Sequence, residues 1–335
     1  MTEDKYVELL NSSPTVKDQR RRESPAGYHY YWSYWENARN WYLKYVLGLR
    51  PKYTSPALVK GACIHEAITK YYLKHDIGDS IDFYQKEMEL RREEYEEAGR
   101  WVTDLNDGIA MLDMWWQVWN KTEVENLTPL EIEKLHEFWI GPDNSLKFTV
   151  RADRIMHEKD FNKNRVYDTK TSGWSISKTI QNVEAEDQIT GYIWAMAKVH
   201  PEWKIQDAVV DVLFKKNSVV KAERSDPIYR TKLDLAIFEL NIIGTIIETT
   251  QKVKALKWYP WPILFPRNGR IAGIFGDPYE AISRIDVKPG QVPTGFIRDE
   301  WVEVKDLVDN IDLAKWDGFK VVQTEEVYES QQSKQ

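Results

Sequence analysis

The sequence predicts an α/β protein organised around one mixed sheet, on the strength of three patterns along the chain. Helical periodicity dominates residues 28–122, strand-like alternation dominates 129–173, and a helix pattern at 183–199 precedes a strand pattern at 207–216. Apolar residues three and four apart indicate helices, whereas alternation at every second residue indicates half-buried strands. The order helix, three strands, helix, strand is typical of one α/β domain with a mixed sheet.

The amino-terminal part predicts a polar arm followed by a helix. Residues 1–26 have no sustained periodicity and include a basic run at 19–22, so we expect a flexible basic arm. A solvated tail is the usual interpretation of such a run, and a phosphate contact is the alternative. Residues 28–51 predict one amphipathic helix that Gly48 and Pro51 end. We favour packing of this helix on a core over a stacking platform for bases.

Three further helices are expected before the strands begin. Residues 55–75 start with Ser55 and Pro56, a typical helix start, and run through helix-forming residues that include His65. Residues 81–122 predict two helices, and apolar residues spaced four and three apart mark the second of them. These two helices form a helical insertion.

The rest of the chain predicts strands and two more helices. We expect three antiparallel strands at 129–141, 145–158 and 165–173, with a polar turn at 159–164. The elements expected next are a helix at 183–199, a strand at 207–216, a long helix from 233 to 247 within a carboxyl-terminal region 232–328, and a frayed tail at 329–335. The chain is rich in Pro, Gly and Trp after residue 257, so its elements there are left unassigned.

The composition excludes several classes of protein. Hydrophobic residues make up 42% and charged residues 30%, which excludes a mainly disordered chain. The formal net charge of -7 argues against a protein that coats nucleic acid through bulk charge. This net charge is still compatible with an enzyme that binds nucleic acid in a local basic groove, because its acidic metal ligands add to the total negative charge. Most of the 15 tryptophans are expected in the core, with room for a stacking surface.

Cysteine content and the amino terminus predict a cytoplasmic protein. The chain has one cysteine, Cys63, which fits a reducing compartment and excludes a four-cysteine zinc or iron–sulfur site within one chain. The first residues lack the apolar core of a signal peptide. No stretch reaches the roughly 20 apolar residues of a membrane helix, so we expect no membrane association.

Two carboxylates and a lysine form the pattern that suggests chemistry. Asp153 and Asp168 lie near the ends of two strands that are expected to be adjacent and antiparallel. Two close carboxylates repel unless a cation lies between them, and Mg²⁺ or Mn²⁺ prefers oxygen ligands. Lys170 shares a strand face with Asp168 and can offset charge on a phosphoryl oxygen. The alternative is an ordinary surface ion pair, which is the usual meaning of Asp-x-Lys on a strand.

Three further residues change the balance between these interpretations. His65 lies on an upstream helix, while Gln188 and Tyr192 lie four apart and so share a face of a downstream helix. Each of them alone is typical of ordinary packing. Their order along the chain, together with the carboxylates, points to a site.

In this order the residues resemble the PD-(D/E)xK phosphodiesterase superfamily, in its RecB-type branch, which includes the iron–sulfur exonucleases of CRISPR systems and many phage-encoded relatives. The branch carries the motifs Gly-x-x-x-His, Gly-x-x-Asp-Arg-Ile, Val-x-Asp-x-Lys-Thr and Gln-x-x-x-Tyr. The matching segments are Gly61 to His65, Arg151 to Ile155 without the glycine, Val166 to Thr171, and Gln188 to Tyr192. The resemblance covers about residues 30–215 and implies a restriction-endonuclease-like core, within a single nuclease domain at 27–328 whose catalytic core is about 55–216.

The resemblance also implies a role for each matching residue. His65, Asp153 and Asp168 would ligate Mg²⁺ or Mn²⁺, with help from the Thr169 carbonyl. Lys170 would position and activate the attacking water.

Further roles follow for the shell of the site. Gln188 and Tyr192 would orient the substrate strand or the groups around the metal. Relatives sometimes use one more carboxylate from the preceding strand, and either Glu131 or Glu133 stands in that region.

Basic residues are candidates for contacts to the nucleic acid. We expect Arg154, Lys215 and Lys216 to take this role, with Lys221 and Arg224 nearby. Residues 215–224 are equally compatible with a solvated turn.

The chain departs from the iron–sulfur members at their cluster ligands. Alignment on residues 45–49 places Asn37 where those members have their first cysteine, and no cysteine follows Cys63. Residues 265–282 resemble the region of the other ligands without the cysteines. We therefore expect no iron–sulfur cluster, and we expect aromatic packing between the first helix and residues 258–282 in its place.

The function that these observations predict is a metal-dependent DNA nuclease. The resemblance favours an exonuclease over an endonuclease, acting on DNA ends or single strands in recombination, repair or phage replication, with protein partners from those processes. A nuclease-fold DNA-binding protein without turnover is the alternative, although the intact acidic and lysine residues argue against it. A sugar-binding module rests on the tryptophan content alone.

Overall fold

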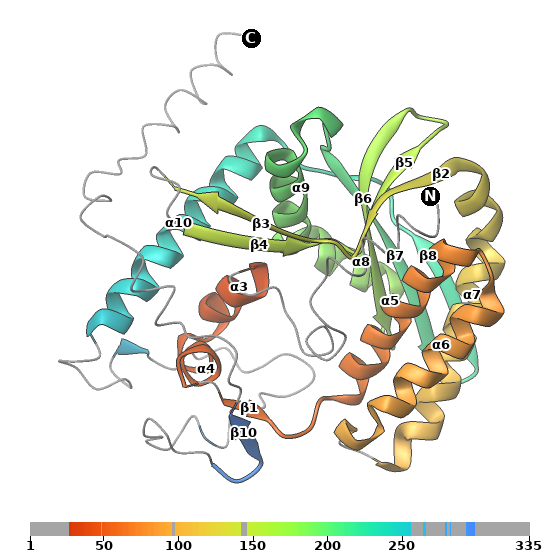
Figure 1. The fold of residues 1–335 in the computed structure, drawn as a ribbon, viewed down its shortest axis with the longest axis horizontal. Coiled ribbons are helices and arrows are strands. Elements are labelled where there is room, and N and C mark those ends of the chain that lie inside the picture. The colour runs from red at the N-terminus through yellow and green to blue at the C-terminus, as the bar shows by residue number, and fades with distance from the viewer. Residues whose placement is uncertain are drawn as a thin grey trace. The chain divides into compact units, whose positions relative to one another are not determined.

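The computed structural model describes residues 27–47, 49–95, 98–141, 146–255, 264–265, 279, 282 and 293–298 (Figure 1). These residues belong to two compact units. The described part of the first unit comprises residues 53–95, 98–135 and 151–230. The described part of the second unit comprises residues 27–47, 49–52, 136–141, 146–150, 231–255, 264–265, 279, 282 and 293–298. The single nuclease domain expected over residues 27–328 stays a prediction.

A six-stranded mixed sheet forms the centre of the first unit. Its strands are β2 (Leu127–Ile132), β5 (Arg154–Glu158), β6 (Lys163–Ser172), β7 (Asp207–Lys216), β8 (Val219–Arg224) and β9 (Ile228–Tyr229). They lie in the order β2-β5-β6-β7-β8, and β9 pairs with β7. Only the β6–β7 pair is parallel among these pairings, which confirms the expected mixed sheet.

Helices flank this sheet, as the sequence predicts. In the described part of the first unit they are α5 (Pro56–Lys74), α6 (Ile77–Leu90), α7 (Trp101–Asn126), α8 (Ile176–Ala185) and α9 (Asp187–Val199). Helices α5, α6 and α7 lie side by side (Figure 1) and enclose a buried core with Met156, Tyr167, Val209 and Leu213 of the sheet. Helices α8 and α9 follow β6 and supply the crossover that the parallel pair with β7 requires.

Local sequence explains where these helices begin. Pro56 stands in the first turn of α5, where its missing N–H has no helical partner to lose. Asp76 caps α6 because its side chain accepts the backbone N–H of Asp79 at 3.1 Å. The helices expected at 55–75 and within 81–122 are confirmed by α5, α6 and α7.

The helix expected at 183–199 corresponds instead to the end of α8 and the whole of α9. The chain is extended at Glu186, with φ -82° and ψ 146°, which separates the two helices. The regular apolar spacing continues across this break, so periodicity alone did not reveal it.

The described part of the second unit contains helices and two small sheets. Its elements are α3 (Tyr28–Glu36), α4 (Ala38–Trp41), a π-helical turn (Tyr42–Val46), β1 (Leu49–Pro51), α10 (Lys232–Ala255), β10 (Phe296–Arg298), and most of β3 (Leu135–Ile140) and β4 (Leu146–Arg151). Strand β1 pairs antiparallel with β10, and β3 pairs with β4. The long helix expected from 233 to 247 is confirmed by α10.

The single helix expected at 28–51 is wrong. The chain leaves the helix at Asn37, where φ is -157°, and α4 restarts at the next residue. The Asn37 side chain accepts the backbone N–H groups of Arg39 and Asn40 at 3.2 and 3.3 Å, and so caps the new helix. Asparagine side chains compete with helical hydrogen bonds in this way, which favours a break at this position.

Two of the expected strands are each divided in two. The segment 129–141 is divided between β2 and β3 around Glu133, whose φ of 48° lies in the left-handed region. The segment 145–158 is divided between β4 and β5 at residues 152–153. The two breaks face each other, because the Glu133 N–H donates to the Asp153 carbonyl at 2.9 Å. The strand at 207–216 is confirmed by β7.

Some expectations concern residues outside the described part of the chain. These are the arm at 1–26, the tail at 329–335 and most of the region after residue 257. Among the described residues, none of the helices has the length and hydropathy needed to span a bilayer.

Candidate metal centre

Three elements of the first unit bring His65, Asp153 and Asp168 together. His65 comes from the middle of α5, Asp153 directly precedes β5, and Asp168 lies in β6. Arg154 pairs with Tyr167 in the antiparallel β5–β6 register, which sets Asp153 beside Asp168. His65 Nδ1 lies 3.0 Å from Asp153 Oδ2. His65 and Asp153 are therefore in direct contact, and Asp168 lies next to Asp153 on the adjacent strand.

A close approach between α5 and β6 helps to place His65. A Cβ atom added to Gly61 would lie 3.3 Å from Thr171 Oγ1, tighter than most such contacts. The missing side chain lets the first turns of α5 lie against the carboxyl end of β6. His65 follows Gly61 by one helical turn on the same face, which gives the Gly-x-x-x-His spacing a physical reason.

The Asp168 carboxylate is the group of this site that most lacks partners. The residue is 1% exposed. Lys170 Nζ lies 2.9 Å from Asp168 Oδ2, yet within the described residues neither carboxylate oxygen accepts a hydrogen bond of normal geometry. A buried carboxylate without donors is unfavourable, and a divalent cation satisfies such oxygens directly. The residues present therefore fit a hard divalent ion.

The charges around the site are strongly coupled. Burial raises the pKa of Asp168 to about 6, although the charge of Lys170 opposes the shift. Burial acts on Asp153 in the same way, but the charge and hydrogen bond of His65 hold the pKa of Asp153 well below its usual range. For His65, burial lowers the pKa, and Asp153 outweighs it and raises the pKa to about 9. Without a metal, His65 and Asp153 thus form a charged pair beside a poorly stabilised Asp168.

Glu133 joins the same group and answers a choice that the sequence left open. Ligand atoms of His65, Glu133 and Asp153 lie within 4.8 Å of one another. Burial and the charge of Asp153 raise the pKa of Glu133 to about 7, and Arg151 Nε lies 3.4 Å from its carboxylate. Left-handed backbone is uncommon for a residue with a long side chain and is often found at functional sites.

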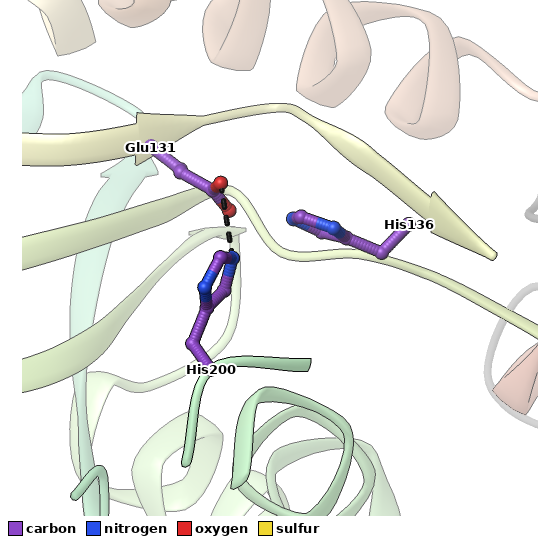
Figure 2. A group of neighbouring side chains, drawn as sticks. All are labelled: Glu131, His136 and His200. Carbon is purple, nitrogen blue, oxygen red and sulfur yellow. Dashed lines mark ion pairs between the residues drawn. The ribbon is translucent and has the colours of Figure 1, made fainter. Parts of the chain in front are cut away.

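Glu131 belongs to a different set of contacts. Its Oε1 atom lies 3.2 Å from Nε2 of His200 and 2.5 Å from Nζ of Lys134. Figure 2 shows the Glu131 carboxylate directed toward the His200 ring. Of the two glutamates, the structure therefore brings Glu133 to the candidate site.

Lys170 is held by a residue of α9. Its Nζ donates to Gln188 Oε1 at 2.8 Å, and Gln188 Nε2 donates to the Tyr192 hydroxyl at 2.9 Å. Gln188 and Tyr192 are buried on one face of α9, 8% and 9% exposed. The shared faces predicted for Asp168 with Lys170 and for Gln188 with Tyr192 are both present.

Thr169 lies between Asp168 and Lys170 and contacts both faces of the sheet. Its backbone N–H donates to Asp153 Oδ2 at 2.8 Å, while its hydroxyl accepts from Arg154 Nη2 at 3.0 Å. The predicted use of its carbonyl as a metal ligand stays a prediction.

The structure corrects the predicted nucleic-acid contact of Arg154. The residue is 1% exposed, and its guanidinium donates to Tyr72, Thr169 and Asp211. A side chain buried to this degree cannot reach a phosphate at the surface. No local pattern in the sequence indicates this burial, because the partners come from other elements.

The two lysines predicted to contact nucleic acid lie at the end of β7. Lys215 Nζ lies 3.0 Å from Asp107 Oδ1, and its side chain is only 13% exposed. Lys216 is exposed. Lys216 is therefore the better placed of the two for a contact to substrate.

Asn37 of the second unit is the residue that the sequence alignment placed at the first cysteine position of the iron–sulfur members. It uses its side-chain oxygen to cap α4. The aromatic packing expected between the first helix and residues 258–282 is present at Phe265, whose ring stacks on Trp41 and Tyr42 with centroid distances of 5.8 and 4.8 Å. Arg39 Nε also donates to the Phe265 carbonyl at 3.3 Å.

A family model and several solved structures match this chain. A search of curated proteins finds no match to this chain. Among solved structures, the chain is similar to one titled "Crystal structure of SSO0001", with 14% identity, a TM-score of 0.28, and coverage of 63% of this chain and 82% of the other. A TM-score of this size does not establish a common fold. The family model described as the PD-(D/E)XK nuclease superfamily matches residues 31–255. A central mixed sheet flanked by helices is what a restriction-endonuclease-like fold has, and the chain belongs to the PD-(D/E)XK nuclease superfamily.

Proposed function

We propose that this protein is a metal-dependent DNA nuclease that hydrolyses phosphodiester bonds. The observation that carries the proposal is that His65 and Asp153 pair beside the buried Asp168 carboxylate, whose oxygens accept no hydrogen bond of normal geometry within the described residues, next to the ammonium group of Lys170. Members of the superfamily are typically nucleases that use divalent metal ions, so membership supports the same chemistry.

The residues that would hold the ion supply oxygen and imidazole ligands. They are His65, Asp153 and Asp168, with Glu133 and the Thr169 carbonyl as additional candidates. Such ligands suit Mg²⁺ or Mn²⁺. When bound, a divalent ion supplies a Lewis acid that offsets negative charge on the phosphate in the transition state. His65 must be neutral to ligate a metal, so its proton leaves on binding.

Lys170 is the proposed catalytic residue of the chain itself. Its charge is retained because, although burial lowers the pKa of Lys170, the nearby Asp168 and Asp153 raise it above the usual value. Gln188 holds the ammonium by accepting one of its hydrogens. A further hydrogen can position the water oxygen that attacks phosphorus. A P–O bond to the water oxygen forms and the P–O bond to the leaving nucleotide breaks, while the water gives up a proton to solvent and the departing oxygen takes up a proton.

An aromatic side chain beside the site suggests where a strand of nucleic acid lies. Trp174 follows the catalytic strand β6 by two residues and is 51% exposed. Lys178 Nζ lies 6.0 Å from the centre of its ring. Lys216 is exposed on β7, the strand that pairs with β6 up to Ser172. Aromatic faces stack on unpaired bases while nearby lysines contact phosphates, which favours a single strand or a frayed end as substrate.

The mode of cleavage and its biological setting follow the family branch that the motifs resemble. We propose an exonuclease that acts on DNA ends in recombination, repair or phage replication, together with proteins of those processes. The alternative is a DNA-binding protein without turnover. The presence of Asp153, Asp168 and Lys170 in one site argues for catalysis.

Cleavage assays test the proposal directly. End-labelled linear single-stranded and double-stranded DNA, and closed circular DNA, are incubated with the protein in MgCl₂, in MnCl₂ and in EDTA. We expect degradation of linear DNA in the presence of either metal and none in EDTA. Binding of DNA without cleavage in both metals would favour the binding protein, and cleavage of circles at the rate of linear DNA would contradict the exonuclease.

A further inference from the structure

Arg154 lies fully inside the first unit and contacts three different elements. Its Nη1 donates to the Tyr72 hydroxyl at 2.8 Å, and its Nη2 donates to Thr169 Oγ1 at 3.0 Å and to Asp211 Oδ2 at 2.8 Å. The guanidinium also lies 5.6 Å from the centres of the Tyr72 and Tyr167 rings. Few rotamers satisfy all of these contacts, so the position of the guanidinium is closely defined.

The partners of Arg154 are neighbours of the candidate metal ligands. Arg154 itself directly follows Asp153, and Thr169 directly follows Asp168. Tyr72 lies seven residues after His65 on α5, which is two helical turns along the same face. Each of the three elements that carries a candidate ligand therefore also provides one member of this set of contacts.

A second arginine completes the charge balance around this group. Arg224 donates to Asp211 and to Glu123, and the Tyr72 hydroxyl donates to Glu123. One buried guanidinium group and one partly buried one are thus matched by two buried carboxylates. Buried charges persist when they are paired and hydrogen-bonded in this way, and removal of one partner is strongly unfavourable. The group therefore resists displacement.

We propose that Arg154 is a positioning residue that fixes the relative placement of His65, Asp153 and Asp168 by joining α5, β5 and β6 from the side of the sheet opposite Asp168. It touches neither substrate nor metal. It acts through Thr169, whose backbone N–H donates to Asp153, and through Tyr72 on the helix of His65. This inference rests on the proposed metal site.

The chain offers a matched control on the same face of the same sheet. Arg165 of β6 is 6% exposed and donates to Asp207 at 2.8 Å and to Glu158. Like Arg154 it is a buried arginine paired with a buried aspartate, although its second partner is a carboxylate and not a hydroxyl group. None of its partners is adjacent in sequence to a candidate metal ligand. A substitution at Arg165 therefore reports the general cost of disturbing a buried ion pair.

The experiment compares Arg154→Lys with Arg165→Lys by Mn²⁺ titration calorimetry, thermal unfolding and steady-state cleavage of linear DNA. Both variants are expected to unfold at lower temperature than the wild type. Only Arg154→Lys is expected to weaken Mn²⁺ binding, by about 10- to 100-fold, and to lower kcat with an unchanged KM for DNA. Arg165→Lys should bind Mn²⁺ within about twofold of the wild type.

A second pair of variants keeps the test valid if Arg154→Lys does not fold. Thr169→Val removes the hydroxyl that accepts from Arg154, whereas Thr169→Ser keeps it, and both keep the backbone N–H to Asp153. We expect weaker Mn²⁺ binding for Thr169→Val and recovery for Thr169→Ser. Equal Mn²⁺ affinity in the valine and serine variants, or equal losses in the Arg154 and Arg165 variants, would overturn the positioning role.

The outcomes also separate this inference from the proposed function. A wild-type protein that binds Mn²⁺ but cleaves no DNA contradicts the proposed nuclease, and the Mn²⁺ affinities of the variants still decide the role of Arg154. A wild-type protein that cleaves DNA, with normal Mn²⁺ binding in Arg154→Lys, contradicts the positioning role alone.

Discussion

Lys170 Nζ lies 2.9 Å from Oδ2 of Asp168, a carboxylate that is 1% exposed. The pairing offsets only part of the cost of burying the acid, since the pKa of Asp168 is still raised to about 6 by its burial. In the metal-free protein the ionised Asp168 carboxylate therefore lowers the free energy of unfolding. Several measurable consequences follow from this relationship and its neighbours.

Asp168→Asn should stabilise the metal-free protein at pH 8 while it abolishes cleavage. A raised carboxyl pKa means that the ionised form is disfavoured in the folded state, and asparagine removes that charge. We expect the free energy of unfolding in EDTA to rise by about 1–3 kcal/mol, from a shift of about two pKa units. Thermal unfolding at pH 8 measures it, and a lower unfolding temperature than the wild type would contradict the assignment.

The stability of the metal-free protein should fall as the pH rises from 5 to about 9. The His65 pKa is raised to about 9, so its contribution is complete below the unfolded value near 6.5 and is lost as the pH passes about 9. The raised pKa values of Asp168 and Glu133, about 6 and 7, act in the same direction at lower pH. Unfolding temperatures in EDTA across this range test the trend.

His65→Gln is the variant that isolates the upper part of this pH range. Glutamine is neutral at every pH, so the decrease in stability between about pH 6.5 and 9 should become shallower. An unchanged slope in this window would show that another group is responsible.

Lys170→Ala should reduce kcat for DNA by about 10²-fold or more, and it should also lower the unfolding temperature because the buried Asp168 loses its compensating charge. The ammonium acts on charge that develops in the transition state, and loss of one such donor costs this much in other enzymes. Lys163→Ala is the control, since Lys163 begins the same strand and its side chain is 50% exposed. Retained metal-dependent cleavage in Lys170→Ala would refute the catalytic role.

Glu133→Gln should weaken Mn²⁺ binding by about 10-fold, because Glu133 shares the site with His65 and Asp153. Glu131→Gln, two residues away, should change the affinity by less than about twofold, because Glu131 pairs with His200 and Lys134. Titration calorimetry with Mn²⁺ at pH 7.5 measures both. The reverse order of the two affinities would return the ligand role to Glu131.

Trp174→Ala should raise the KM for single-stranded DNA by about fivefold or more with little change in kcat, because base stacking contributes about 1–3 kcal/mol per base. Phe161→Ala provides the control, since Phe161 is 68% exposed in the β5–β6 turn, before the start of β6. If both variants show the same KM as the wild type, Trp174 is not a stacking residue.

The sequence determined those parts of the fold and site that depend on neighbours a few residues apart. The strand 207–216 and the helix from Pro56 were predictable because alternation and a helix-start residue are local properties. The shared faces of Asp168 with Lys170 and of Gln188 with Tyr192 follow from the periods of a strand and a helix. His65 lies too far along the chain from Asp153 for strand or helix periodicity to relate the two residues. His65 was therefore assigned to the site from the order of the family motifs.

The tertiary structure alone decided the roles of Arg154 and Glu133. Arginine is usually found at the protein surface. Arg154 is buried instead, because it pairs with Asp211, which lies 57 residues away in β7. Glu133 rather than Glu131 reaches the site because the backbone turns into the left-handed region where β2 meets the residue before β5. Burial and backbone turns of this kind are set by long-range contacts, and no period in the sequence records which distant residues will meet.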